Sequence, residues 1–173
     1  RVSSHYKIYV DGTVDLEQTY LPQGELPELP RLGSAFVLGE EYENLSWYGR
    51  GPWENYPDRK TSCLIGRWNS KVSEQYTHYP RPQDSGNHED VTEVILTNKQ
   101  GKGVRVTALH YTVDDIYKTT HDCDLKPRKE VVLSLDAAVL GLGNSSCGPG
   151  VLKKYAIDKQ KSHTLRVRFS LIK

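Results

Sequence analysis

The stretch Trp47-Tyr48-Gly49-Arg50-Gly51-Pro52-Trp53-Glu54-Asn55-Tyr56-Pro57-Asp58-Arg59 shapes the expected fold more than any other part of the chain. Leu45 and Trp47 alternate with polar neighbours, which is the period of a strand with one buried face. Gly51-Pro52 then ends the pairing, because proline has no N–H for a sheet ladder. Residues 55–58 have the composition of a turn. The stretch therefore predicts a strand that ends in a shaped loop.

Two interpretations of this loop remain open on residue types alone. Loops held by a rigid scaffold often carry binding groups, and tyrosine and tryptophan rings suit sugar stacking as well as sheet packing. The alternative is a folded corner whose rings fill the core and whose Arg59 pairs with Asp58 or Glu54. We favour the packing interpretation, because clusters of aromatic residues are usually part of a core.

Short segments with strand-like alternation recur along the chain, at residues 6–10, 14–18, 34–38, 44–48, 91–96, 104–110, 130–135 and 165–169. Asp11-Gly12 predicts a hairpin with a two-residue type I′ turn, and Gly101 marks the tip of a second hairpin. Residues 111–117 are also expected to be extended, whereas residues 59–75 fit either a short helix or a strand. Because no ten residues keep a helical period, the chain is predicted to be all-β, as a sandwich or a barrel.

Size and charge limit the possible functions. At 173 residues the chain has the length of one domain and can bury a core. Its 23 lysines and arginines against 22 aspartates and glutamates give no electrostatic case for binding nucleic acid or an anionic membrane. The sequence also lacks the long apolar run of a membrane-spanning helix. It begins at Arg1 and contains no methionine, which fits a piece of a longer protein.

Residue types mark no catalytic or metal centre. Cys63, Cys123 and Cys147 are widely spaced without a C-x-x-C pair, so free thiols are expected, although one disulfide remains open. His121-Asp122-Cys123-Asp124 places its ligands too close together for one tetrahedral site. Glycoside chemistry needs two facing carboxyl groups, and nothing in the sequence pairs any two of its turn carboxylates. We therefore predict no metal and no cofactor.

The glycine-rich segment 141–150 is the most loop-like part of the chain. It lacks the Lys-Ser/Thr ending and the following helix of a phosphate-binding loop. It is either a plain long turn or a source of amide and hydroxyl groups that hydrogen-bond a sugar.

Four motifs follow one another along the chain, at residues 29–33 (LPRLG), 47–59 (WYGRGPWENYPDR), 79–91 (YPRPQDSGNHEDV) and 143–149 (GNSSCGP). Their order, reaching from about Tyr6 to Phe169, resembles the C-terminal domain of family 2 glycoside hydrolases of the large bacterial β-galactosidase type. The resemblance implies a β-sandwich of the galactose-mutarotase-like supersandwich kind. Residues 1–173 would form a single domain at the end of a multidomain enzyme. Some strands of the full sandwich are then expected to be missing, which would leave exposed edges.

The resemblance also implies that the catalytic residues lie in another domain of the enzyme. In this family the full-length enzyme hydrolyses terminal β-D-galactosides, and its catalytic glutamates lie in a separate TIM barrel. This chain is therefore not expected to catalyse anything alone or to hold a cofactor. Its expected partners are the remaining domains of the same glycosidase, a galactoside at the domain interface, and further copies in a homo-oligomer. Bacterial cytoplasm and periplasm both remain open as its compartment.

The substrate-binding residues implied by the resemblance are Asn144, Ser145, Ser146 and Cys147, in a loop lent to the active-site mouth. Cys147 stands where some members place a tryptophan against the sugar, so we expect a missing stacking platform and a roomier acceptor side. The structural signature comprises Trp47, Trp53, Asn55, Tyr56, Asp58 and Arg59. Asp58 and Arg59 are expected to tie this corner down.

The third motif departs from the family's Pro-Gln-Glu-x-Gly-Asn-Arg pattern at two positions. Asp84 is a shorter acid, and His88 replaces the arginine. Any ion pair that the arginine makes in relatives is expected to be weaker or pH-dependent here.

Two other functions remain open. One is a free-standing carbohydrate-binding module that uses Trp47, Trp53 and Tyr56. The other, which rests on fold analogy, is a mutarotase-like epimerase with His88 or His110 as its catalytic residue.

Overall fold

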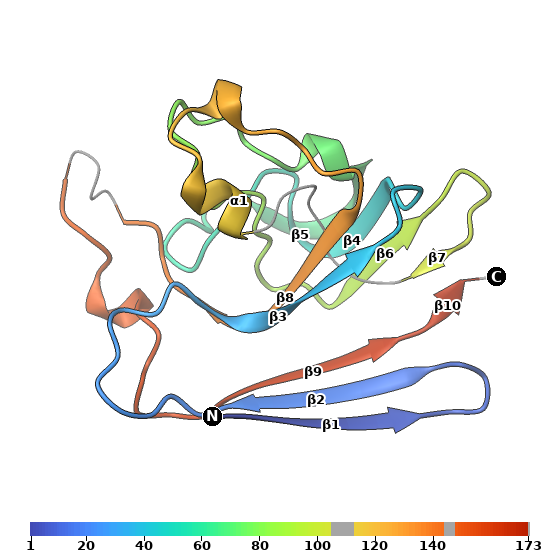
Figure 1. The fold of residues 1–173 in the computed structure, drawn as a ribbon, viewed down its shortest axis with the longest axis horizontal. Helices are drawn as coiled ribbons and strands as arrows, with labels where there is room; N and C mark the ends of the chain where they lie inside the picture. Colours follow the sequence, from blue (N-terminus) through green and yellow to red (C-terminus); the bar gives the residue numbers. More distant parts are fainter. Residues whose placement is uncertain (105–112, 144–147, 173) are drawn as a thin grey trace.

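The computed structural model describes residues 1–104, 113–143 and 148–172, and in these ranges the fold is built from antiparallel β-strands (Figure 1). The strands are β1 (Val2–Ile8), β2 (Val14–Tyr20), β3 (Arg31–Leu38), β4 (Asn44–Gly51), β5 (Leu64–Lys71), β6 (Glu93–Thr97), β7 (Gly103–Val104), β8 (Val131–Val139), β9 (His163–Phe169) and β10 (Leu171–Ile172). One short α-helix, α1 (Val113–Lys118), and three 3₁₀ turns, Val72–Glu74, Asp122–Asp124 and Lys153–Tyr155, complete the described elements. The all-β prediction is confirmed.

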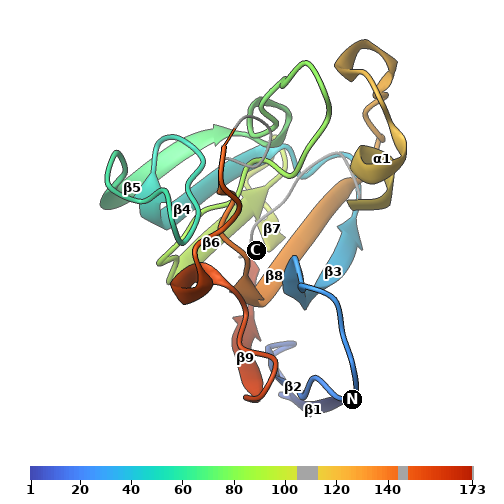
Figure 2. The ribbon, with the colours of Figure 1, turned by 90° about the vertical axis from the view of Figure 1, so that its left-hand side faces the viewer.

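The strands form three sheets. Their orders are β1-β2-β9, β10-β7-β6-β4-β5 and β3-β8. The three-stranded sheet lies as a separate layer below the other two in both views, as in a β-sandwich (Figures 1 and 2). The layers meet where Phe36 of β3 packs edge-on against Phe169 of β9, with ring centroids 5.3 Å apart. The Tyr20 hydroxyl of β2 also lies 2.9 Å from the Ser34 hydroxyl of β3.

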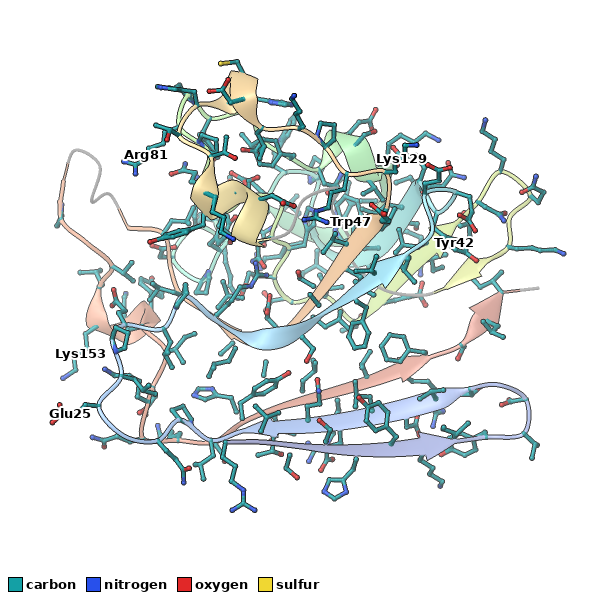
Figure 3. All side chains as sticks on the ribbon, viewed as in Figure 1. Glu25, Tyr42, Trp47, Arg81, Lys129 and Lys153 are labelled. Atoms are coloured by element: carbon teal, nitrogen blue, oxygen red, sulfur yellow. The ribbon has the colours of Figure 1, made fainter. Side chains whose placement is uncertain are left out.

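The main core lies between the inward faces of β4, β6 and β8. Alternate residues of a strand point to the same face, and this period places the buried side chains on one side of each strand. The cluster comprises Leu45, Trp47, Val72, Val94, Leu96, Val131 and Leu133. Figure 3 shows Trp47 in the interior, whereas Arg81 and Lys153 project outward.

Two local predictions are wrong. In the first hairpin the Gly12 N–H donates to the Tyr9 carbonyl, and only Gly12, at φ +85°, takes a positive φ. A type I′ turn needs positive φ at both central residues, so Asp11 excludes it, and the loop is a type I turn closed by a left-handed glycine. Residues 113–118 are helical rather than extended, because this short helix buries Ile116 against Tyr76.

β1 is the first strand of its sheet in the described residues, and its side chains are exposed. Tyr6 lies opposite the buried Leu16 and shares its face, yet all seven residues of β1 are exposed. Side chains of Val2 and Ile8 are likewise exposed on that face. Residues 59–75, for which helix and strand were both open, contain the edge strand β5.

Candidate functional site

The corner that follows β4 is held by side chains that bind backbone groups of another motif. Asn55 is fully buried, and its amide donates to the Trp53 carbonyl at 3.0 Å and accepts the Glu89 N–H at 2.8 Å. The Asn87 side-chain amide donates in return to the Asn55 carbonyl at 2.7 Å. These bonds join the second motif to the third, because each one satisfies a polar group that the fold has removed from water.

Of the two partners considered for Arg59, Asp58 and Glu54, the structure shows Glu54. Arg59 Nη2 lies 2.5 Å from Glu54 Oε1, and its guanidinium lies over the Tyr56 ring at 5.4 Å. Glu54 also accepts the Tyr79 hydroxyl and, at 2.8 Å, the Gly86 N–H. Its carboxylate therefore binds the corner to the loop that carries the third motif.

The three rings considered as a sugar platform, Trp47, Trp53 and Tyr56, have different environments. Trp47 and Tyr56 are 1% and 0% exposed, as the packing interpretation predicts, but Trp53 is 72% exposed and belongs to no core. Gly51-Pro52 ends β4 just before Trp53, and the chain turns outward there. The sugar platform proposed for Trp47, Trp53 and Tyr56 is therefore wrong, because two of its three rings are enclosed by protein.

Asp58 does not tie down its own stretch but holds a distant segment. Its Oδ1 accepts the Leu142 N–H at 3.0 Å, and its Oδ2 accepts the Gly143 N–H at 2.8 Å. Gly141 leaves room for this contact, since a Cβ there would lie 2.7 Å from the Asp58 Cγ. Hydrogen bonds to a carboxylate are stronger than those between neutral groups. The second motif thus fixes the backbone that leads into the fourth.

The two arms of segment 141–150 meet at a point that we call the loop neck, formed by Gly141–Gly143 and Gly150–Val151. Gly143 has φ +61°, and a Cβ on it would lie 2.7 Å from the Val151 nitrogen. The Gly141 N–H donates to the Tyr155 carbonyl at 3.1 Å. Asn144, Ser145, Ser146 and Cys147, which the resemblance implies as substrate-binding residues, lie outside the described residues, in the interval that this neck closes.

The first motif reaches the same region through Arg31. Its guanidinium binds Asp136 through Nε, at 3.2 Å, and Nη2, and binds Asp84 through Nη1 at 3.1 Å. Burial raises the pKa of Asp84, and the neighbouring Arg31 cation opposes that rise. The Leu140 N–H also donates to the Pro30 carbonyl at 2.9 Å. All four motifs therefore converge on the loop neck and its supports.

His88 is half-buried and packs against the core. Its ring centroid lies 4.3 Å from that of Trp47, Nδ1 is 3.2 Å from the Arg50 carbonyl, and Nε2 is 2.7 Å from Gln75 Oε1. Burial lowers the pKa of His88 to about 4, so the ring is neutral at neutral pH. Of the two outcomes expected here, a weaker ion pair or a pH-dependent one, the neutral ring fits the first, because its hydrogen-bond partners are a carbonyl and an amide oxygen. Both ring nitrogens of His88 have oxygen partners within the fold, and His110, the other residue considered for an epimerase, lies outside the described residues.

Two of the cysteines are free thiols. Cys63 is fully buried with Sγ 3.4 Å from the Trp53 carbonyl, and Cys123 is exposed. Cys147 lies outside the described residues. Within the described ranges, no three histidine, cysteine, aspartate or glutamate side chains are placed to hold a metal ion. Among the helices of the same ranges, none is long and apolar enough to cross a membrane.

Comparisons with known proteins place this geometry in context. A family model described as the small chain of β-galactosidase matches residues 1–171. The chain is 36% identical over 168 residues to a β-galactosidase of Priestia megaterium. The match covers 92% of this chain and 16% of that protein. For a β-galactosidase of Kluyveromyces lactis the identity is 36% over 162 residues. The match covers 89% of this chain and 15% of that protein. For β-galactosidase BgaC of Bifidobacterium adolescentis the identity is 31% over 185 residues. The match covers 99% of this chain and 18% of that protein. The chain thus spans only a small part of the length of these relatives.

Proposed function

The chain belongs to the β-galactosidase small-chain family, and we propose that it is the C-terminal domain of a family 2 β-galactosidase that hydrolyses terminal β-D-galactosides. In this proposal residues 1–173 form one domain, and the catalytic carboxylates come from another part of the full-length protein. The domain contributes shape to the active-site mouth and surface to the contacts between domains. It needs no cofactor of its own.

The observation that carries the proposal is the loop neck. Segment 141–150 leaves and re-enters the fold through two arms that touch at Gly143 and Val151. Its first arm is fixed by Asp58 and by the Tyr155 carbonyl. A loop anchored so firmly at its base can present residues 144–147 to a substrate bound by another domain. Residues of the four motifs thus support the base of this one loop.

Cys147 is the residue of this loop with the sharpest expected effect. A tryptophan stacks on a sugar ring, whereas a cysteine side chain is small and offers no ring face. We propose that the acceptor side of the galactoside site is therefore roomier in this protein than in relatives with an aromatic residue there. The partners in this arrangement are the remaining domains of the chain, the galactoside at their interface, and further copies of the enzyme in a homo-oligomer.

The substrate class is tested with the full-length enzyme and a panel of nitrophenyl glycosides. We expect cleavage of the β-D-galactoside in preference to the other sugars. Turnover of another glycoside with no turnover of the galactoside would refute the proposal. The loop's role is tested separately with Cys147→Trp, which we expect to change the KM for a disaccharide or the share of transglycosylation. Cys123→Trp, at an exposed cysteine outside the neck, is the matched control.

A further inference from the structure

β5 is an open edge of the five-stranded sheet, because among the described residues it pairs only with β4. Figure 2 shows it at the outer margin of the molecule. Unpaired N–H and C=O groups along such an edge attract other strands, and proteins usually protect an edge with charged side chains or cover it. Arg67 and Lys71 are exposed along its second half, but Leu64–Gly66 carries no charge. The beginning of this edge therefore lacks protection of its own.

Large apolar side chains project from both faces of this unprotected part. Consecutive residues of a strand point to opposite faces, and Leu64 is 72% and Ile65 47% exposed. Ile65 lies opposite Arg50, so it shares the outer face of the sheet with the exposed Tyr48, two residues before Arg50. The apolar surface thus wraps around the edge instead of covering one face only.

Trp53 joins the same surface from the corner after β4. Leu64 pairs with Gly51, two residues before Trp53, and the Cys63 thiol lies 3.4 Å from the Trp53 carbonyl. The backbone that carries Trp53 is thus held beside the start of β5, while its indole ring is 72% exposed. We call this surface the edge patch, and it comprises Tyr48, Trp53, Leu64 and Ile65.

Ion pairs border the edge patch. The Arg50 guanidinium donates to the Cys63 carbonyl at 2.8 Å and pairs with Asp90 at 2.5 Å. The Lys60 ammonium lies 3.1 Å from the same carboxylate. An apolar centre that contains a tryptophan and is bordered by charges is the usual anatomy of a protein interface. A sugar site would instead need polar groups around the ring face, and the two aliphatic side chains of the patch offer none.

We propose that the edge patch is the docking surface for another domain of the same enzyme chain. The inference rests on the proposed function, in which residues 1–173 are one domain, and this chain covers only 15% to 18% of the matched relatives. A stable dimer of separate copies buries about 800 Å² on each partner, from about 20 to 30 residues a side. The edge patch has four large side chains, which suffice for a partner that the covalent chain keeps at a high effective concentration.

The first experiment is hydroxyl-radical footprinting of the full-length wild-type enzyme. The oxidation rates of Trp53 and Trp47 are each compared with the rates in a synthetic peptide of residues 47–60, which exposes both rings. Trp47, at 1% exposed, gives the fully buried limit. We expect the rate at Trp53 to fall at least about fivefold, because side chains at the centre of an interface are removed from water. A smaller decrease would overturn the inference, since the domain alone leaves this ring 72% exposed.

The second experiment identifies the occupant by cross-linking the full-length enzyme with Trp53→p-benzoyl-L-phenylalanine. A preparation that mixes copies with and without a heavy-isotope label separates contacts within one chain from contacts between copies. We expect a cross-link to a peptide of the same chain outside residues 1–173. A mixed-isotope cross-link, which marks a second copy, would overturn the inference, and so would a cross-link confined to residues 1–173 or no cross-link at all.

Tyr117→p-benzoyl-L-phenylalanine is the matched control, because the Tyr117 ring is 87% exposed on α1, outside the edge patch. Capture of the same peptide from both positions would mean that the contact is unspecific, and it would also overturn the inference.

Two further arms separate the inference from its alternatives. Footprinting is repeated with lactose, and protection of Trp53 that appears only with lactose would assign the patch to a sugar and overturn the docking role. Galactoside cleavage by an enzyme whose Trp53 is unprotected would refute the docking role alone. Protection and a same-chain cross-link in an enzyme that leaves galactosides intact would support the docking role and refute the proposed function.

Discussion

His88 should make the stability of the domain depend on pH. Burial lowers its pKa from an ordinary value of 6.5 to about 4. Between these two values the unfolded chain binds a proton that the folded chain excludes, so unfolding is favoured as the pH falls. The part of the free energy of unfolding that depends on a neutral His88 is fully present above pH 6.5 and is lost as the pH falls towards 4. The difference between the unfolded and the folded pKa of His88 corresponds to about 3 kcal/mol of stability. About 2 kcal/mol of this is lost between pH 7 and pH 5.

The perturbation is His88→Gln, which keeps polar atoms near the Arg50 carbonyl and Gln75 but removes the titrating ring. The assay is urea unfolding of the 173-residue chain between pH 5 and pH 7, once a cooperative transition at pH 7 has shown that the chain folds alone. Tryptophan fluorescence suits it, because the His88 ring lies against Trp47. We expect wild type to lose about 2 kcal/mol more than the variant over this range. His5→Gln, at an exposed histidine of β1, should keep the wild-type pH dependence.

Parallel pH curves for wild type and His88→Gln would refute this reasoning. Both ring nitrogens face oxygen atoms, the Arg50 carbonyl at 3.2 Å and Gln75 Oε1 at 2.7 Å. An imidazolium would donate to both, whereas a neutral ring donates to one. Parallel curves would therefore mean that these two acceptors offset the effect of burial, so that the ring binds its proton equally well in the folded and the unfolded chain.

Three further substitutions test the supports of the fold. Arg31→Ala should cost about 3 to 5 kcal/mol, because it leaves the carboxylates of Asp136 and Asp84 without their shared cation, and adding Asp84→Asn should restore part of that loss. Gly143→Ala should cost about 1 to 3 kcal/mol, because φ +61° is unfavourable for alanine and its Cβ meets the returning arm of the neck. Tyr20→Phe should cost about 1 to 2 kcal/mol, because its hydroxyl joins the side chains of Gln18 on β2 and Ser34 on β3, which belong to different sheets. The thermal midpoint of the full-length enzyme measures each effect, and a change of less than about 0.5 kcal/mol would contradict the corresponding contact.

Alternation in the sequence predicted most strands, because a two-residue period follows directly from strand geometry. It placed Leu45 and Trp47 on a buried face, and both are buried. The same pattern in β1 predicted a buried face that is exposed. Alternation reports that a strand has two different faces, but what covers a face depends on segments elsewhere in the chain. A helix of six residues such as α1 is also too short to show a helical period.

Neighbouring residues of the signature differ in ways that composition does not reveal. Asp58 and Arg59 appeared equivalent as residues that tie down the corner. Arg59 finds Glu54 five positions away, as local reasoning expected, whereas Asp58 binds Leu142. The partner of Asp58 depends on how two distant loops pack, and no residue type near Asp58 signals that contact. Asn55 was part of the predicted signature, but its partners at residues 87 and 89 were not predicted, because they belong to another motif.

One physical role explains why the motifs are rich in polar residues. A loop that leaves a sheet exposes backbone N–H and C=O groups, and buried groups of this kind need partners. Side chains of one motif supply these partners to another: Glu54 to Gly86, Asn55 to Glu89, and Asp58 to Leu142. Substitutions in the signature should therefore act on chemistry through the loops that they hold. The test of any signature residue is then a change in acceptor binding at unchanged kcat, which a catalytic residue would not produce.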